Sequence, residues 1–146
     1  MNRHASILTF LFILCFTFVS LPSATAQDAV LGEWWNGEKD GKVTMYKKGD
    51  KIYGKISWAN DPRKDTKNPD KSLRSRDVVG SDVFTNFSYD ASEKEWVDGE
   101  VYDPKNGKTY SCMMWLEKNN PKKLNIRGYV LGMTFLGRTE IFTRVE

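Results

Sequence analysis

Histidine is nearly absent from this 146-residue chain, in which His4 is the only one. The first 26 residues have the features of a secretory signal peptide, so we expect His4 to be removed with them. A processed chain without imidazole could not use a Ser-His-Asp triad, a Cys-His pair or a histidine-ligated zinc ion. We therefore expect no metal and no cofactor, and we favour a protein that is not an enzyme.

Long apolar runs are missing outside the N-terminal segment. There, Arg3 and His4 precede an apolar run over residues 7–19, and Ala24-Thr25-Ala26 forms a cleavage motif. A run of about 13 residues is too short for a permanent transmembrane helix. Cleavage after residue 26 would leave a single domain over residues 27–146, exported to the periplasm or the medium and without a stable membrane anchor.

Cysteine is also scarce, with Cys15 in the predicted leader and Cys112 in the domain. A single remaining thiol cannot form an intramolecular disulfide. Cys112 alternates with Tyr110 and Met114, which predicts that it is buried and unreactive.

A strong excess of either charge is absent too. The formal net charge is +3, and lysines, arginines, aspartates and glutamates are interspersed along the chain. Binding to nucleic acid requires a clustered basic face, so we do not expect a nucleic-acid partner.

The chain does contain a series of short runs that suit β-strands. The clearest pair lies within residues 96–116, where two aromatic-rich runs flank the turn Asp103-Pro104-Lys105-Asn106-Gly107. Eight strands at short, regular spacing predict an all-β fold, an antiparallel meander of about eight strands closed into a barrel, with an open sandwich as the alternative. The expected strands cover residues 30–35, 42–47, 51–59, 82–89, 95–102, 109–117, 124–131 and 134–145.

Residues 60–80 interrupt this pattern with two prolines and charges of both signs. A loop of about 20 residues in a compact domain is unusual, and serves as a lid, as a binding loop or merely as a mobile segment. A calcium site is suggested by the oxygen-bearing side chains of Asp61, Asp65, Asn68 and Asp70. Their spacing fits no calcium-binding loop, however, and basic residues interleave with them. We interpret the segment as a solvated loop of mixed charge.

Carboxylates could still carry catalysis in a domain without histidine. Asp98, Glu100 and Tyr102 share a strand face by their spacing, so burial could give the two carboxylates separate acid and base roles. Solvent-exposed positions on the wet side of a strand are the commoner explanation, and exposure of both carboxylates would end the catalytic hypothesis.

A polar ligand site is the other candidate. Arg138 and Glu140 share a face of the last expected strand, and Arg127 and Tyr129 share a face of the preceding one. If these faces line the interior, they and Lys55 would form a polar floor for a small apolar or anionic ligand. We favour the alternative, in which they point outward as exposed ion pairs, because unpaired inward charges are costly.

Several motifs resemble a family of exported bacterial proteins, domain of unknown function 2147. They are Gly32-x-Trp34, Tyr53-Gly54-Lys55-Ile56, Asp65-x-x-Asn68-Pro69-Asp70, Trp96-x-x-Gly99-x-x-Tyr102-Asp103-Pro104-x-x-Gly107-Lys108-x-Tyr110, Leu124-x-x-Arg127-Gly128-Tyr129 and Gly137-Arg138-Thr139-x-x-Phe142-Thr143-Arg144. The chain departs at Phe142, where the family pattern has Trp, and at Lys47-Lys48, where relatives carry cysteine.

The resemblance implies a small lipocalin-like barrel and no established activity. A fainter similarity to calycins, in which a Gly-x-Trp on the first strand packs near an arginine on the last, makes Trp34 and Arg144 a structural clasp. We expect a non-enzymatic binder of a small, partly apolar ligand in the barrel lumen, with loop 60–80 at the mouth. The alternative is an envelope or secreted module with a packed core that binds another protein, and Trp34, Trp58 and Trp115 filling the interior would favour it.

Overall fold

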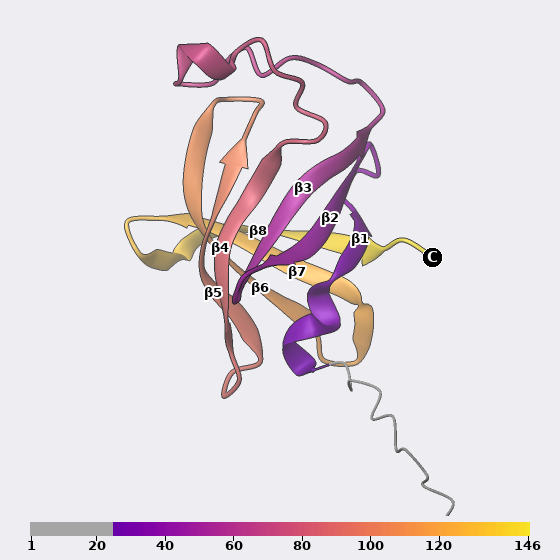
Figure 1. The fold of residues 1–146 in the computed structure, drawn as a ribbon. Helices are drawn as coiled ribbons and strands as arrows, with labels where there is room; N and C mark the ends of the chain where they lie inside the picture. Colours follow the sequence, from indigo (N-terminus) through magenta and orange to yellow (C-terminus); the bar gives the residue numbers. More distant parts are fainter. Residues whose placement is uncertain (1–24) are drawn as a thin grey trace, which may run out of the picture.

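The structure, a computed structural model, describes residues 25–146. Eight antiparallel strands, each paired with its neighbour in sequence, form a closed barrel (Figure 1). The all-β meander barrel predicted from the sequence is therefore confirmed, and the open sandwich is excluded. Nearly all of the predicted leader, with His4 and Cys15, lies outside the described residues. None of the helices in the described part of the chain is long and apolar enough to cross a membrane.

Every strand predicted from the alternating pattern is present, and its ends agree with the prediction to within a few residues. Two short 3-10 helices, η1 and η2, accompany the strands. The elements are η1 Ala26–Val30, β1 Gly32–Trp35, β2 Gly41–Lys48, β3 Lys51–Ala59, η2 Lys71–Leu73, β4 Asp82–Asp90, β5 Glu95–Asp103, β6 Lys108–Glu117, β7 Asn120–Val130 and β8 Met133–Arg144.

The centre of the barrel is packed with side chains from all eight strands. Trp34, Trp96 and Phe87 are the largest of these fully buried groups. Close packing depends on Gly99, because a Cβ atom there would lie 2.4 Å from the Phe87 ring. Filling of the interior by Trp34, Trp58 and Trp115 would have favoured the packed-core alternative, but only Trp34 of these three belongs to the buried core.

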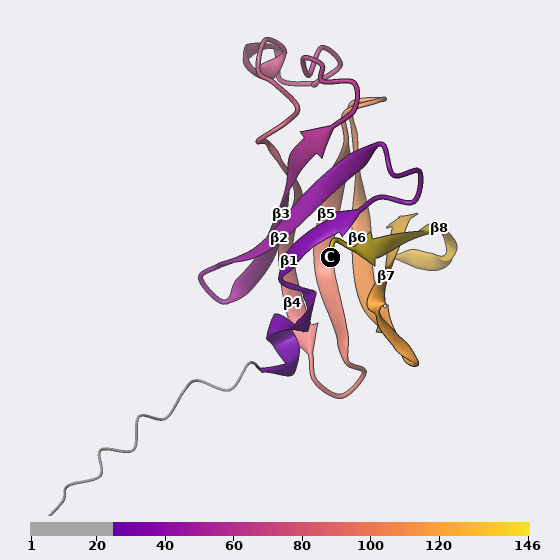
Figure 2. The same ribbon diagram turned by 90° about the vertical axis from the view of Figure 1, so that its right-hand side faces the viewer.

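The lower end of the barrel is covered by η1 (Figures 1 and 2). Val30 is fully buried there, and its carbonyl oxygen accepts a hydrogen bond of 2.8 Å from Trp34 Nε1. The Trp96 Nε1 group donates to the Gln27 carbonyl at 3.1 Å. The N–H group of each buried indole therefore has a hydrogen-bond acceptor. Loop 60–80 lies at the opposite end of the barrel from η1.

The barrel closes between its first and last strands. Trp34 pairs with Arg144 and Trp35 pairs with Thr143. The Arg144 guanidinium carbon lies 3.8 Å from the centroid of the Trp34 ring, and its nitrogens donate to the carbonyls of Ala29 and Leu31. This is the geometry of the clasp expected from the calycin similarity, and the stability that it contributes stays a prediction.

Candidate functional site

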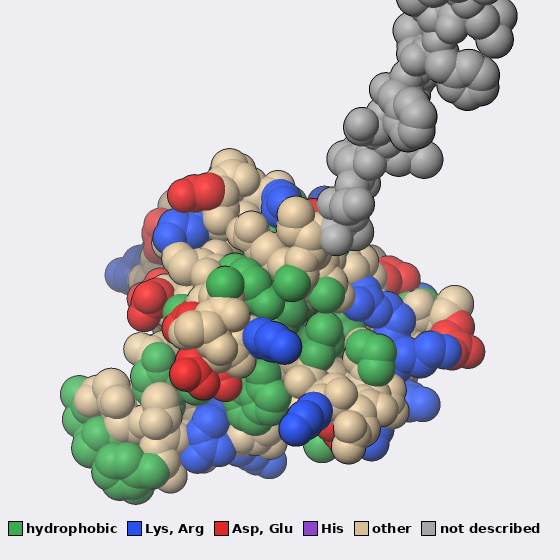
Figure 3. Space-filling view, turned by 90° about the horizontal axis from the view of Figure 1, so that it is seen from below, with side chains coloured by type: hydrophobic (Ala, Val, Ile, Leu, Met, Phe, Trp, Pro, Cys, Tyr) green, Lys and Arg blue, Asp and Glu red, His purple; other side chains and the backbone are tan. Residues whose placement is uncertain are grey.

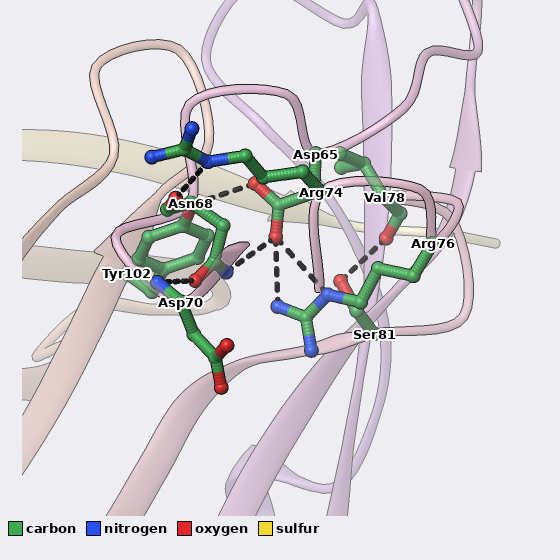
Figure 4. Close-up of polar contacts among 8 residues, drawn as sticks. All are labelled: Asp65, Asn68, Asp70, Arg74, Arg76, Val78, Ser81 and Tyr102. Atoms are coloured by element: carbon green, nitrogen blue, oxygen red, sulfur yellow. Dashed lines mark hydrogen bonds and ion pairs between the residues drawn. The ribbon is translucent and has the colours of Figure 1, made fainter. Parts of the chain in front are cut away.

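Loop 60–80 is built around a buried carboxylate. Asp65 is fully buried and accepts hydrogen bonds from the Tyr102 hydroxyl at 2.6 Å and from Asn68 Nδ2 at 2.8 Å. Arg76 adds two more, at 3.0 and 2.9 Å (Figure 4). The interpretation of this segment as a solvated loop is wrong for Asp65 and Asn68, since both are buried.

The charge states of this cluster follow from its contacts. Burial raises the pKa of Asp65, but hydrogen bonds from Tyr102, Asn68 and Arg76 outweigh it and hold that pKa below its usual value. Burial and the neighbouring Asp65 carboxylate raise the pKa of Tyr102 to about 12. At neutral pH the carboxylate is therefore ionised and the phenol keeps its proton, which suits a strong hydrogen bond between them.

The loop is also held against the β5–β6 turn. Gly107 has a φ of +74°, and a Cβ atom there would lie 2.0 Å from the Lys67 carbonyl oxygen. Within the loop, the Asp65 amide donates to the Arg76 carbonyl at 3.0 Å and the Val78 amide to the Arg63 carbonyl at 3.0 Å. These contacts make the segment a fixed wall at the mouth of the barrel.

A cavity of about 190 Å³ lies at this mouth, between the loop, the ends of β2 and β3 and the β5–β6 turn. The Trp58 side chain is 41% exposed there, and its ring meets the Trp35 ring edge-on, with 5.6 Å between centroids. The apolar side chains of the cavity are Ile56, Trp58, Ala59, Val78, Val79 and Pro104. The polar ones are Asn36, Asp40, Lys42, Asn60, Asp61, Arg63, Asp103 and Lys105.

The rim of this cavity carries charges of both signs that already have partners. The Lys42 ammonium lies 3.6 Å from Glu33 and 4.6 Å from the centroid of the Trp35 ring. The Lys105 ammonium lies 3.9 Å from Glu38. Such a rim does not select one sign of charge, whereas the Trp58 indole that also lines the cavity suits an apolar group.

The structure does not bring the five predicted ligand residues together. Arg127 pairs with Thr139 across β7 and β8, whereas Arg138 pairs with Gly128, so the two arginines lie on opposite faces of the hairpin. The Arg127 guanidinium donates to the Thr134 carbonyl at 2.6 Å and to Thr139 Oγ1 at 2.7 Å.

The other predicted ligand residues are likewise dispersed. Lys55 is exposed on β3 with its ammonium 5.4 Å from the Tyr46 ring centroid, and Tyr129 is half-buried on β7. Glu140 is exposed and accepts a hydrogen bond of 3.0 Å from the Gly37 amide. Neither these three nor the two arginines line the mouth cavity, and their binding role stays a prediction.

The carboxylates considered for catalysis are both exposed. Asp98 has a φ of +58° at a register shift in β5, so a bulge also interrupts the face that it was expected to share with Glu100. Tyr102 belongs to the Asp65 cluster instead. Without burial to separate the acidities of the two carboxylates, the catalytic hypothesis is abandoned.

One group of site residues was missed by sequence reasoning. This group is the buried cluster of Asp65, Asn68 and Arg76. The motif Asp65-x-x-Asn68-Pro69-Asp70 was the sequence feature that could have indicated it. Asp70 caps η2 by accepting from the Ser72 amide at 2.9 Å. Over residues 25–146 no three histidine, cysteine, aspartate or glutamate side chains are grouped to hold a metal ion.

Comparison with known proteins identifies the family of the chain and supports its barrel fold. Residues 32–144, from the first strand to the last, match the family described as uncharacterized proteins conserved in bacteria, domain of unknown function 2147. The chain belongs to this family. Its fold is similar to that of a solved protein from the human pathogen Helicobacter pylori, which is described as a member of the lipocalin family. The TM-score is 0.71 and the sequence identity is 19%. The similarity covers 80% of this chain and 83% of that chain. None of the curated proteins matches the chain.

Proposed function

We propose that this member of the family binds a small, partly apolar ligand in the mouth cavity, with Trp58 as the main contact. The observation that carries the proposal is a partly exposed indole that lines a cavity beside the fixed loop. An exposed aromatic face loses little conformational entropy on binding and offers a large apolar area.

The packed interior moves the expected site from the lumen to the mouth. Trp34, Phe87 and Trp96 occupy the centre of the barrel, and a ligand there would have to displace them. At the mouth, a ligand needs to displace only water. The similarity to a lipocalin-family protein supports this placement, because barrels of that fold class hold small ligands at or below one open end.

The size and lining of the cavity limit the ligand class. Its volume of about 190 Å³ lies below the roughly 300 to 1,000 Å³ of pockets for drug-sized molecules. A single ring or a short acyl chain would cover Trp58, Val78 and Val79, and a polar group would lie at the rim. We therefore expect a ligand with one apolar face and one hydrogen-bonding end.

A nitrogen-15 NMR titration with a panel of small ring-containing and acyl compounds tests this proposal. The expected result is a set of chemical-shift changes centred on Ile56, Trp58, Val78 and Val79 for the compounds that bind. Trp58→Ala should weaken binding by more than tenfold, which is about 1.4 kcal/mol or more. Trp115→Ala, which removes a half-buried indole outside the cavity, is the matched control and should leave the affinity unchanged. Shifts centred on any other part of the barrel would overturn the proposal.

We also propose that the protein is exported and processed after Ala26. The tripartite pattern of residues 1–26 supports export. Cleavage there would keep the Gln27 carbonyl that the Trp96 indole binds. Mass measurement of the protein from its own source should give a chain that begins at Gln27, and a chain that retains Met1 would contradict the proposal.

A further inference from the structure

The turn between β7 and β8 exposes an unusual amount of apolar surface. Leu131 is 85% exposed, Phe135 75% and Leu136 60%. We call residues 130–137 the hairpin tip. Figure 3 shows it as a hydrophobic lobe that projects from the body of the molecule. Isolated exposed leucines are ordinary, but this cluster of neighbours at a protrusion is not.

The backbone at the hairpin tip makes the choice of leucine more unusual. Val130 and Met133 are paired, so Leu131 and Gly132 form a two-residue hairpin turn. Their φ angles are +54° and +68°. A turn with positive φ at both central residues favours the sequence Asn-Gly. A leucine in this left-handed region is sterically unfavourable by about 1 kcal/mol. Leu131 is thus unfavourable both for the turn and for contact with water, so a role in binding is the natural reason for it.

The two other exposed side chains are held outward by a wide bulge in β8. Between the pairs Gly128–Arg138 and Val130–Met133, one residue of β7 faces four of β8. The Arg127 guanidinium fills this bulge and donates to the carbonyls of Thr134 and Phe135. It thereby supports a conformation that keeps Phe135 and Leu136 in solvent.

Within the β7–β8 hairpin, the charged side chains that flank the tip are of one sign. The stretch of residues 118–139 contains no aspartate or glutamate, and Arg127 and Arg138 border the tip on its two strands. Arg138 is exposed. An uncharged apolar tip with a basic collar is the pattern of segments that enter the head-group region of anionic membranes.

We propose that the hairpin tip inserts Leu131, Phe135 and Leu136 into the interfacial region of a bilayer that contains anionic lipids. A bilayer accommodates a convex apolar projection, whereas a protein partner would need a matching hollow. A second copy of this chain meeting tip to tip would bring two basic collars together, which is electrostatically unfavourable. The contact is reversible and peripheral, because three inserted side chains do not make a permanent anchor.

Vesicle sedimentation of the processed protein tests this inference. It should bind vesicles of phosphatidylethanolamine and phosphatidylglycerol, and bind phosphatidylcholine vesicles less. Leu131→Asn should lower partitioning about tenfold, which is the effect of losing one buried leucine side chain. The same variant should be as stable as the wild type or more so, since asparagine suits the positive φ. Ile141→Thr, an exposed apolar site on β8 outside the tip, is the control and should bind normally.

Two further variants separate insertion from other kinds of binding. Arg138→Gln should weaken binding to the anionic vesicles about fivefold and reduce its dependence on salt. Phe135→Cys carrying an environment-sensitive dye should shift its emission to the blue when vesicles are added. Cys112 is fully buried, so the dye attaches to the new thiol.

Three results would overturn the inference. The first is absence of sedimentation with anionic vesicles. The second is wild-type binding by Leu131→Asn and by Phe135→Ser. The third is a dimer in analytical ultracentrifugation that Leu131→Asn dissociates, which would assign the hairpin tip to a second copy of the chain.

Discussion

Asp65 illustrates how one side chain can organise a whole loop. An isolated buried carboxylate is strongly destabilising, but Asp65 has partners from three places: Tyr102 on β5, Asn68 in the middle of the loop and Arg76 near its end. Each partner ties a different segment to the same carboxylate. The result is a wall for the mouth cavity where a loop of this composition would otherwise be solvated.

Asp65→Asn should therefore lower the free energy of unfolding by about 3 kcal/mol, because Arg76 and Tyr102 would lose a charged acceptor. Denaturant unfolding at neutral pH measures this loss. Asp98→Asn, at an exposed carboxylate, should change stability by no more than about 0.5 kcal/mol. Equal effects of the two substitutions would show that the Asp65 cluster contributes no net stability.

The same carboxylate gives a prediction for acid. Its folded-state pKa is lowered, so its stabilisation is fully present above the unfolded-state pKa of about 3.9 and is lost as the pH falls through the folded-state value. The wild type should lose more stability below about pH 4 than Asp65→Asn does. Parallel stability curves for the two proteins across this range would contradict the assignment.

Arg144 makes the corresponding contribution at the closure of the barrel. Arg144→Lys keeps the charge but removes the planar group that stacks on Trp34 and bonds to two carbonyls, which should cost about 1 to 2 kcal/mol. Arg138→Lys is the control, because that side chain is exposed. Thermal unfolding compares the two variants. Identical unfolding midpoints would show that the contact between Arg144 and Trp34 does not stabilise the barrel.

At the scale of elements, the contact between loop 60–80 and the β5–β6 turn rests on a glycine. Gly107 and Gly49 both have a positive φ, but only Gly107 lies against another segment. Gly49→Ala should destabilise by about 1 kcal/mol through its backbone alone. Gly107→Ala should cost more and should speed amide hydrogen exchange within residues 60–80. If the two variants match in both measurements, the loop is not held by this contact.

Sequence patterns predicted the elements well because strands and hairpin turns are local. The alternation within residues 96–116 and the turn at Asp103-Pro104 depend on neighbours a few positions apart. The Asp65 cluster could not be read in this way, because Asp65 and Tyr102 are 37 residues apart in the chain. Bulges also defeat the pattern: Asn86 and Asp98 have positive φ within β4 and β5, so alternation changes face there.

For the whole molecule, the predicted closed barrel was correct but the expected location of the ligand was not supported. Alternation identifies which side chains point inward, yet it does not reveal whether they fill the space. Trp96 and Phe87 fill it together with Trp34, and η1 covers the lower end. The remaining opening is the mouth, where Trp58 lies beside the fixed loop.

Native mass spectrometry of the protein purified from its own source shows whether the mouth of the barrel holds a ligand. We predict that the wild type and Trp115→Ala carry the extra mass of one small molecule, and that Trp58→Ala does not. Spectra without added mass for all three proteins, or the same added mass on Trp58→Ala as on the wild type, would contradict a ligand site at the mouth of the barrel.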